Sequence, residues 1–133
     1  MRFSRSIFLF MPAVVLICGC QAVRVYEGSR LPGDEVSRIK AEPASILQTM
    51  TLVAPELLSV DFTPAGNKVY EVLPGLHRVI VFLGKPGNMG SHIEMIYFET
   101  EPGVDYKVYG VYGQEIWVED DAGEAVRLYM IAY

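Results

Sequence analysis

Apolar and polar residues alternate in short stretches along most of the chain, and residues typical of turns separate these stretches. Alternation with a period of two indicates strands with one buried face, whereas no stretch has the 3.6-residue period of a long amphipathic helix. The pattern predicts a strand or one helical turn at residues 35–41, and strands at 45–53, 57–62, 68–73, 77–83, 92–100, 105–112, 115–119 and 125–131. We therefore expect an all-β fold, a small antiparallel β-sandwich or open barrel of about seven strands.

Residues 77–83 (HRVIVFL) form the most apolar stretch after the N-terminal segment. Both faces of this strand would carry apolar side chains, which is typical of a central strand covered on two sides. Pro74-Gly75 precedes it, and this pair suits a type II turn because glycine tolerates a positive φ. Residues 120–124 are expected to close a final hairpin between the strands at 115–119 and 125–131.

The first 19 residues have the layout of a secretory signal segment. Arg2 and Arg5 supply positive charge, residues 7–17 are uninterruptedly apolar, and Gly19 precedes Cys20. The apolar run is shorter than the roughly 20 residues that a membrane-spanning helix needs. We therefore expect this segment to be removed.

Ile17-Cys18-Gly19-Cys20 resembles the lipobox of bacterial lipoproteins, in which an aliphatic residue and two small residues precede an acylated cysteine. Cys18 departs from the Ala or Ser that is usual at its position. The resemblance implies cleavage before Cys20 and attachment of several acyl chains there, which together hold a protein stably on a membrane. Gln21, which is not Asp, resembles the pattern sorted to the outer membrane, on its periplasmic side. The alternative is an ordinary secreted protein with two chance cysteines.

The expected domain organisation has three parts. Residues 1–19 are the signal peptide, 20–34 are the acylated cysteine and a tether containing Pro32-Gly33-Asp34, and 35–133 are the β-sandwich. Loss of Arg2 and Arg5 leaves nine of the 11 Lys and Arg against 16 Asp and Glu, a formal charge of −7. This acidic balance argues against nucleic acid as a partner. With Cys18 removed and Cys20 acylated, no thiol remains for a disulfide.

Two further stretches resemble known modules. Val72 to Val81 is similar to the "PGxHxVxV" turn and strand of PEGA-type β-sandwich modules from bacterial envelope proteins. Glu101 to Tyr106, followed by Trp117 to Asp120, resembles the second half of small lipoproteins built around that turn. The likeness covers about residues 70–124 and consists mostly of turn chemistry, so it implies a fold and carries over no catalytic residue.

Candidate metal-binding and catalytic residues are few. His77 and His92 are the only histidines, and no third ligand accompanies His92 and Glu94. The acidic residues Glu115, Glu119, Asp120, Asp121 and Glu124 do not have EF-hand spacing and also fit a solvated hairpin loop. After Cys20 there is no cysteine, no Gly-x-Ser-x-Gly and no phosphate-binding loop. We therefore expect no metal, no cofactor and no catalytic activity.

The C-terminal half is rich in aromatic residues. Tyr106, Tyr109, Tyr112 and Trp117 form the candidate binding face, with Tyr106 and Tyr112 on one side of their strand and Tyr109 on the other. Such amphipathic rings either fill a sandwich core, which is the commoner case, or bind a protein or a glycan.

Taken together, these features predict a membrane-anchored envelope lipoprotein whose β-sandwich is a non-catalytic binding or scaffolding module with a protein partner. The alternative is an accessory subunit that binds a small ligand or glycan in a secretion, transport or cell-wall system. An enzyme is the third choice.

The lipobox predicts acylation of Cys20. Labelled palmitate fed to the producing cells should enter the wild-type chain and should not enter the Cys20→Ser variant. Label in Cys20→Ser, or release of the wild-type chain as a soluble protein, would show that the lipobox prediction is wrong.

Overall fold

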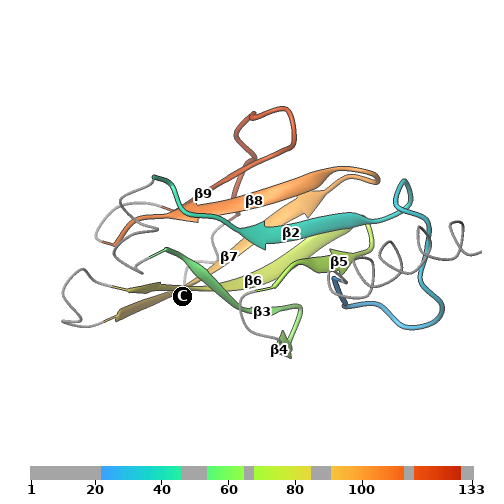
Figure 1. The fold of residues 1–133 in the computed structure, drawn as a ribbon, viewed down its shortest axis with the longest axis horizontal. Coiled ribbons are helices and arrows are strands. Elements are labelled where there is room, and N and C mark those ends of the chain that lie inside the picture. Colours follow the sequence, from blue (N-terminus) through green and yellow to red (C-terminus); the bar gives the residue numbers. More distant parts are fainter. Residues whose placement is uncertain (1–21, 46–53, 65–67, 85–90, 113–115, 130–133) are drawn as a thin grey trace, which may run out of the picture.

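The computed structural model describes residues 22–45, 54–64, 68–84, 91–112 and 116–129. These residues form two sheets packed face to face, and no helix occurs among them (Figure 1). The expected all-β sandwich is therefore confirmed. Nine strands occur among the described residues, against the expected total of about seven, and two of them, β1 and β4, are pairs of residues too short to give a periodic signal.

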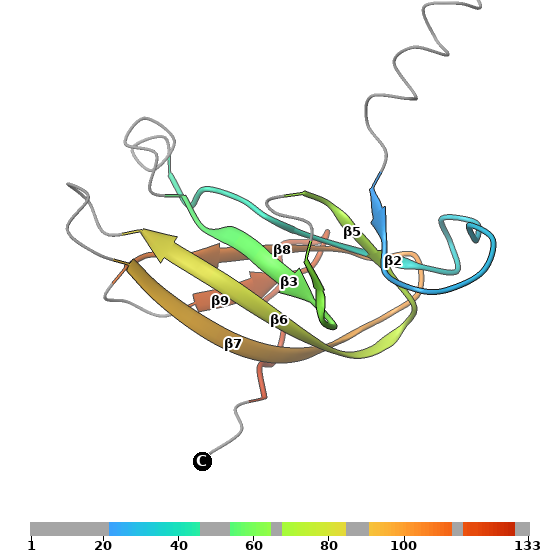
Figure 2. The ribbon, with the colours of Figure 1, turned by 90° about the horizontal axis from the view of Figure 1, so that it is seen from below.

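One layer is an antiparallel sheet of four strands in the order β4-β3-β6-β7. The strands are β3 (Glu56–Val60), β4 (Thr63–Pro64), β6 (Gly75–Gly84) and β7 (Ser91–Thr100). Ten consecutive residue pairs join β6 to β7, from Gly75 opposite Thr100 to Gly84 opposite Ser91. Figure 2 shows this sheet from its outer side, with β3, β6 and β7 in front of the other layer.

The other layer is a mixed sheet of five strands in the order β1-β5-β2-β8-β9. The strands are β1 (Val23–Arg24), β2 (Ser37–Ala41), β5 (Tyr70–Val72), β8 (Asp105–Gly110) and β9 (Ile116–Glu119). β1 pairs with β5 in parallel, and β2 pairs with β8 in parallel. The antiparallel expectation is thus wrong for these two pairs, since strands far apart in the sequence meet here and no hairpin turn sets their direction.

The core lies between the sheets and consists of side chains from alternate positions of the facing strands. The five-stranded sheet contributes Ile39, Tyr70, Val72, Tyr106, Val108, Ile116 and Val118, and the four-stranded sheet contributes Leu57, Val60, Val79, Val81, Leu83, Ile96 and Phe98. Phe98 and Tyr106 connect the layers, with ring centroids 5.7 Å apart. Burial of this alternating set is the main stabilising contribution in a domain of this size.

Strand β6 occupies the expected central place, between β3 and β7, but it is not covered on both faces. His77, Val79, Val81 and Leu83 are buried in the core, whereas Arg78, Ile80 and Phe82 on the other face are only partly buried. The expectation of two covered faces is therefore wrong. No segment among the described residues packs over the outer face of β6 (Figure 2).

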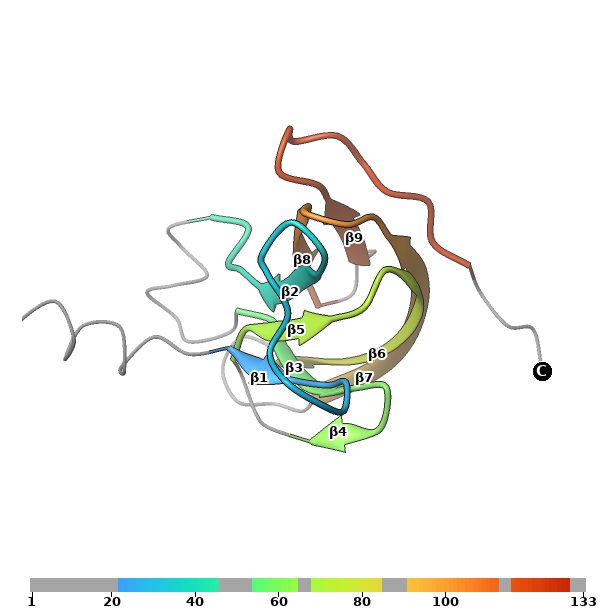
Figure 3. The same cartoon turned by 90° about the vertical axis from the view of Figure 1, so that its right-hand side faces the viewer.

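The C-terminal part of the described chain is not the strand expected at 125–131. Ala125 and Tyr129 form only isolated bridges, to Glu119 of β9 and to Tyr97 of β7. The N–H of Val126 donates to the carbonyl of Val118, and the N–H of Tyr129 donates to the carbonyl of Tyr97. The segment therefore runs from the edge of one sheet to the edge of the other and covers that side of the sandwich (Figure 3). The strand expected at 45–53 lies almost wholly outside the described residues.

Two substitutions on the four-stranded sheet test the assignment of its inner face. Val81 is fully buried and Ile93 is 58% exposed on the outer face. Val81→Asp should unfold the domain or lower the free energy of unfolding by about 4 kcal/mol or more, because it buries an unpaired charge. Ile93→Asp, the matched control, should change it by about 1 kcal/mol at most. Thermal melts followed by circular dichroism would decide, and similar losses in both variants would contradict the assignment.

Candidate functional site

The structure divides the four aromatic residues of the predicted binding face between the core and the surface. Tyr106 is buried in the core, and its hydroxyl oxygen accepts a hydrogen bond of 2.8 Å from the N–H of Glu101. Burial raises the pKa of Tyr106 above its ordinary value. Tyr112 is partly buried and packs against the core. Tyr106 is therefore a core residue and cannot be part of an exposed binding face, because the inner positions of β8 face the opposite sheet.

Tyr109 and Trp117 lie opposite each other on β8 and β9, on the outer face of the five-stranded sheet. Their rings stack with centroids 5.4 Å apart and planes 16° apart, and the indole N–H of Trp117 donates to Glu119 at 3.0 Å. Burial and, next, the charge of Glu119 raise the pKa of Tyr109. Each ring covers one face of the other, so the pair leaves a small half-buried aromatic surface.

Several exposed large apolar side chains lie on or beside the other sheet. Leu76 is 57% exposed, Ile93 is 58% exposed, and Phe62, beside the sheet, is 74% exposed. We define the docking patch as the end of this outer face near Gly75. It consists of Phe62, Leu76, Arg78, Tyr97, Glu99 and Tyr129. Exposed apolar side chains that lie next to one another in this way are typical of interaction surfaces.

Phe62 is held in the docking patch by an unusual backbone. The pairing of Val60 with Thr63 leaves Asp61 and Phe62 as a two-residue turn, with φ values of 48° and 68°. A left-handed backbone is rare for a bulky residue, and such strain persists only where the surroundings enforce it. The guanidinium carbon of Arg78 lies 3.4 Å from the centre of the Phe62 ring. The expected strand at 57–62 thus ends at Val60.

Besides this cation–π contact, Arg78 has a buried hydrogen-bond donor that is not satisfied. Its Nε is buried and has no acceptor among the described residues, and none of the ion pairs found among these residues includes Arg78. A buried donor without a partner costs about 1–3 kcal/mol. An arginine beside exposed aromatic rings is also the residue type most typical of binding hot spots.

Asp61 and His77 stabilise the β3–β4 turn through polar contacts. One carboxylate oxygen of Asp61 accepts the N–H of Arg78 at 2.9 Å, and the other contacts Nδ1 of His77. Nε2 of His77 lies 2.6 Å from the carbonyl oxygen of Leu73. Both ring nitrogens of His77 are therefore engaged by neighbouring oxygen atoms. The buried imidazole therefore ties the β3–β4 turn to the corner before β6.

His92 and Asp120, two of the other charged residues singled out in the sequence, have local partners. His92 pairs with Glu94 at 3.0 Å at the exposed end of β7. Asp120 organises the loop after β9, since one of its oxygens accepts the N–H groups of Ala122 and Glu124. Glu115 lies outside the described residues. Within the described part of the chain, no three His, Cys, Asp or Glu side chains gather in an arrangement that would hold a metal ion.

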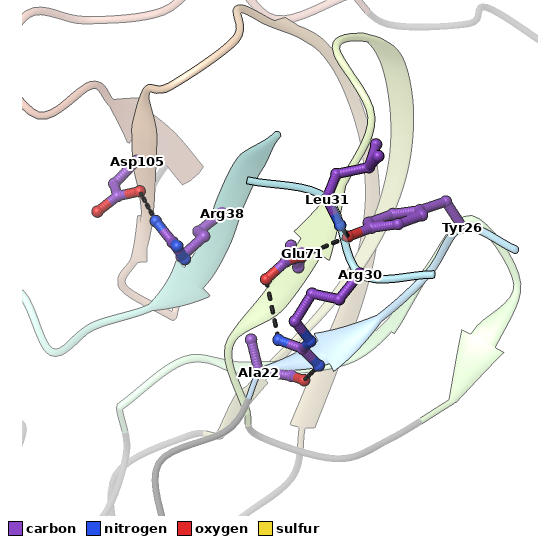
Figure 4. Close-up of polar contacts among 7 residues, drawn as sticks. All are labelled: Ala22, Tyr26, Arg30, Leu31, Arg38, Glu71 and Asp105. Atoms are coloured by element: carbon purple, nitrogen blue, oxygen red, sulfur yellow. Dashed lines mark hydrogen bonds and ion pairs between the residues drawn. The ribbon is translucent and has the colours of Figure 1, made fainter. Parts of the chain in front are cut away.

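The segment expected to be a tether is docked on the sandwich over its described part. The N–H of Val23 donates to the carbonyl of Val69, and that of Val25 donates to the carbonyl of Glu71. The Glu71 side chain is only 4% exposed. Its carboxylate accepts a hydrogen bond of 2.5 Å from the hydroxyl of Tyr26 and forms an ion pair with Arg30 at 3.1 Å (Figure 4). We call this arrangement the Glu71 clasp. Sequence reasoning missed it, because one Glu in an alternating strand is expected to face solvent.

A small pocket lies beside β2 and β8 of the five-stranded sheet. It has a volume of about 160 Å³ and is lined by Arg38, Lys40, Val69, Asp105 and Tyr106. Two of these lining residues, Arg38 and Asp105, form an ion pair at 3.4 Å, and both side chains are about half exposed. A loose, exposed pair of this kind contributes little to stability.

Cys20 and the rest of the predicted lipobox lie outside the described residues, so acylation remains a prediction. Within the described residues, no helix has the length and apolarity needed to cross a membrane. Searches of protein-family models, curated proteins and solved structures found no match to this chain. The PEGA-type likeness therefore rests on the turn and strand residues alone.

The Glu71 clasp predicts that Glu71→Ala will release the N-terminal segment. The substitution leaves Tyr26 and Arg30 without their acceptor, and it should cost about 2 kcal/mol. This figure is below that of a fully buried pair because Arg30 is 42% exposed. Hydrogen exchange at the Val25 amide should become faster while exchange in β6 stays slow. Asp105→Ala is the control, with an expected change of about 0.5 kcal/mol at most. Unchanged protection of Val25 in Glu71→Ala would contradict the clasp.

Proposed function

We propose that the chain is a lipid-anchored protein of the bacterial cell envelope whose sandwich binds a protein partner through the docking patch. The anchor is Cys20, and Gln21 favours the periplasmic side of the outer membrane. The module is non-catalytic. It holds or positions its partner at the membrane surface.

The observation that carries the proposal is the conformation of Phe62. A bulky apolar side chain that is 74% exposed, on a backbone with φ of 68°, is unfavourable in two respects in the free protein. Glycine or asparagine would relieve the backbone strain, and a polar residue would suit the exposure. Retaining phenylalanine there, with Arg78 against its ring, is explained if a partner covers both side chains.

The docked N-terminal segment supports a partner close to the membrane. Pairing with β5 begins at Val23, three residues after Cys20. Fully extended, three residues span roughly 10 Å. An acylated Cys20 would therefore hold the sandwich against the membrane surface, with little freedom to reach a distant partner.

The environment of His77 supports a binding role over catalysis. A general base needs a free ring nitrogen, and both nitrogens of His77 are already engaged, by Asp61 and by the carbonyl of Leu73. The exposed His92 pairs with Glu94 alone. Neither histidine stands next to a serine or threonine hydroxyl in the hydrogen bonds found among the described residues.

The second candidate is binding of a glycan or another small ligand at Tyr109 and Trp117. A stacked aromatic pair flanked by the Glu119 carboxylate offers an apolar face and a polar edge, which suits a sugar ring. Because this pair lies on the opposite sheet from the docking patch, the two candidates can be tested separately.

Site-specific photocrosslinking in cells producing the full chain tests the proposal. A photoreactive amino acid at position 76, in the docking patch, should give a protein adduct, whereas the same group at position 107, on the opposite sheet, should not. Phe62→Gly should reduce the adduct at position 76 about tenfold. The same variant should raise the free energy of unfolding by about 0.5–1 kcal/mol, because glycine relieves the positive φ.

Opposite changes in binding and stability would show that Phe62 is kept for recognition. Equal adducts at positions 76 and 107, or a Phe62→Gly variant that loses stability and crosslinks as before, would contradict the proposal. Adducts with a glycan from position 117, and none from position 76, would favour the second candidate.

A further inference from the structure

We infer that the partner of the docking patch is a second copy of this chain, joined to the first in a symmetric face-to-face dimer. This inference rests on the proposed function, because it names the occupant of the same surface. It follows from the placement of two charges and two apolar side chains on β6 and β7.

These four side chains form the corners of a parallelogram on the outer face. Arg78 lies opposite Tyr97, and Leu76 lies opposite Glu99, in neighbouring rows of the β6–β7 ladder. The cation and the anion therefore occupy one diagonal, and Leu76 and Tyr97 occupy the other. Neither Arg78 nor Glu99 forms an ion pair among the described residues, although such diagonal neighbours lie only about 7–8 Å apart.

A two-fold axis lying in the plane of this face makes the arrangement self-complementary. An axis that is the perpendicular bisector of the line from Arg78 to Glu99 places each Arg78 over the Glu99 of the other copy, so the same ion pair forms twice. With strands about 4.8 Å apart and alternate residues about 6.8 Å apart, this axis runs close to the other diagonal. Leu76 and Tyr97 then meet their own counterparts, which is the pattern of an isologous interface.

The surroundings of the parallelogram extend this contact. Phe62 flanks it on the side of Arg78, and Tyr129 flanks it on the side of Tyr97. Phe62, Leu76 and Tyr129 are three of the most exposed large apolar side chains among the described residues. Burying them between two copies adds apolar contact around the reciprocal ion pairs and removes water from them.

The net negative charge disfavours contact between two copies over most of the surface, but it does not disfavour contact through the docking patch. With a formal charge of −7 after loss of Arg2 and Arg5, two copies repel each other over most of their surface. The docking patch has one cation, Arg78, and one anion, Glu99, so it brings no net like charge together. Anchoring at Cys20 would also confine both copies to one membrane, which raises their effective concentration.

Charge reversal in trans tests the dimer. Full-length chains with two different affinity tags are co-produced, and the fraction of one that copurifies with the other from solubilised membranes is measured. Wild-type copies should copurify. Two copies of Arg78→Glu, or two copies of Glu99→Arg, should copurify about tenfold less, because like charges then face each other at both contacts. Lys107→Glu, a charge reversal on the opposite sheet, is the control and should copurify as the wild type does.

The decisive combination is one copy with Arg78→Glu and a second copy with Glu99→Arg. Opposite charges then face each other at both contacts of the pair, so copurification should return to within about twofold of the wild-type level. An intrachain effect cannot produce this recovery, since each chain still carries an unmatched reversal. Circular dichroism melts of each variant would confirm that it folds.

Two results would overturn the inference. If wild-type copies do not copurify while position 76 crosslinks to a different protein, the docking patch binds a heterologous partner; the proposed function then stands and the dimer is wrong. If wild-type copies copurify but the mixed pair does not recover, the contact lies elsewhere on the surface. Failure of both copurification and crosslinking would contradict the proposed function itself.

Discussion

The carboxylate of Asp61 connects the turn after β3 to the start of β6, and the docking patch depends on this connection. One oxygen accepts the N–H of Arg78 and the other contacts the ring of His77, while the N–H of Asp61 donates to the carbonyl of Arg78 at 2.9 Å. These bonds compensate the left-handed backbone of two consecutive residues that are not glycine. Because Phe62 follows Asp61 directly, the same bonds fix where its ring meets Arg78.

The two faces of β6 explain how one strand could serve both stability and the proposed recognition. Val79, Val81 and Leu83 enter the core, and the intervening Arg78, Ile80 and Phe82 face outward on a sheet that no described segment covers. Burial of the inner face holds the strand rigid, so the outer face is presented without an ordering cost on binding. At the other sheet, the buried carboxylate of the Glu71 clasp holds the N-terminal segment against the sandwich, where the sequence predicted a free tether.

The strands were the most predictable part of the fold. Residues 68–73, 77–83, 92–100 and 105–112 each overlap an observed strand, because alternation of apolar and polar residues depends only on local geometry. The ends of strands were less predictable. Asp61 and Phe62 form a turn although Phe favours strands, and in residues 125–129 only Ala125 and Tyr129 form bridges although the sequence alternates. In both places a hydrogen bond to a distant strand outweighs the local preference.

The sequence alone determined the all-β class, the positive φ of Gly75 after Pro74 and the division of Tyr106 and Tyr109 between opposite faces of one strand. These features follow from periodicity and from the conformational freedom of single residues. Only the tertiary structure decided which outer face is uncovered, that Tyr106 is core, that Glu71 is buried, and that Phe62 and Arg78 meet. Each of these depends on which strands lie side by side and on contacts between residues far apart in the sequence, such as Tyr26 and Glu71, which are 45 positions apart. No local pattern encodes such contacts.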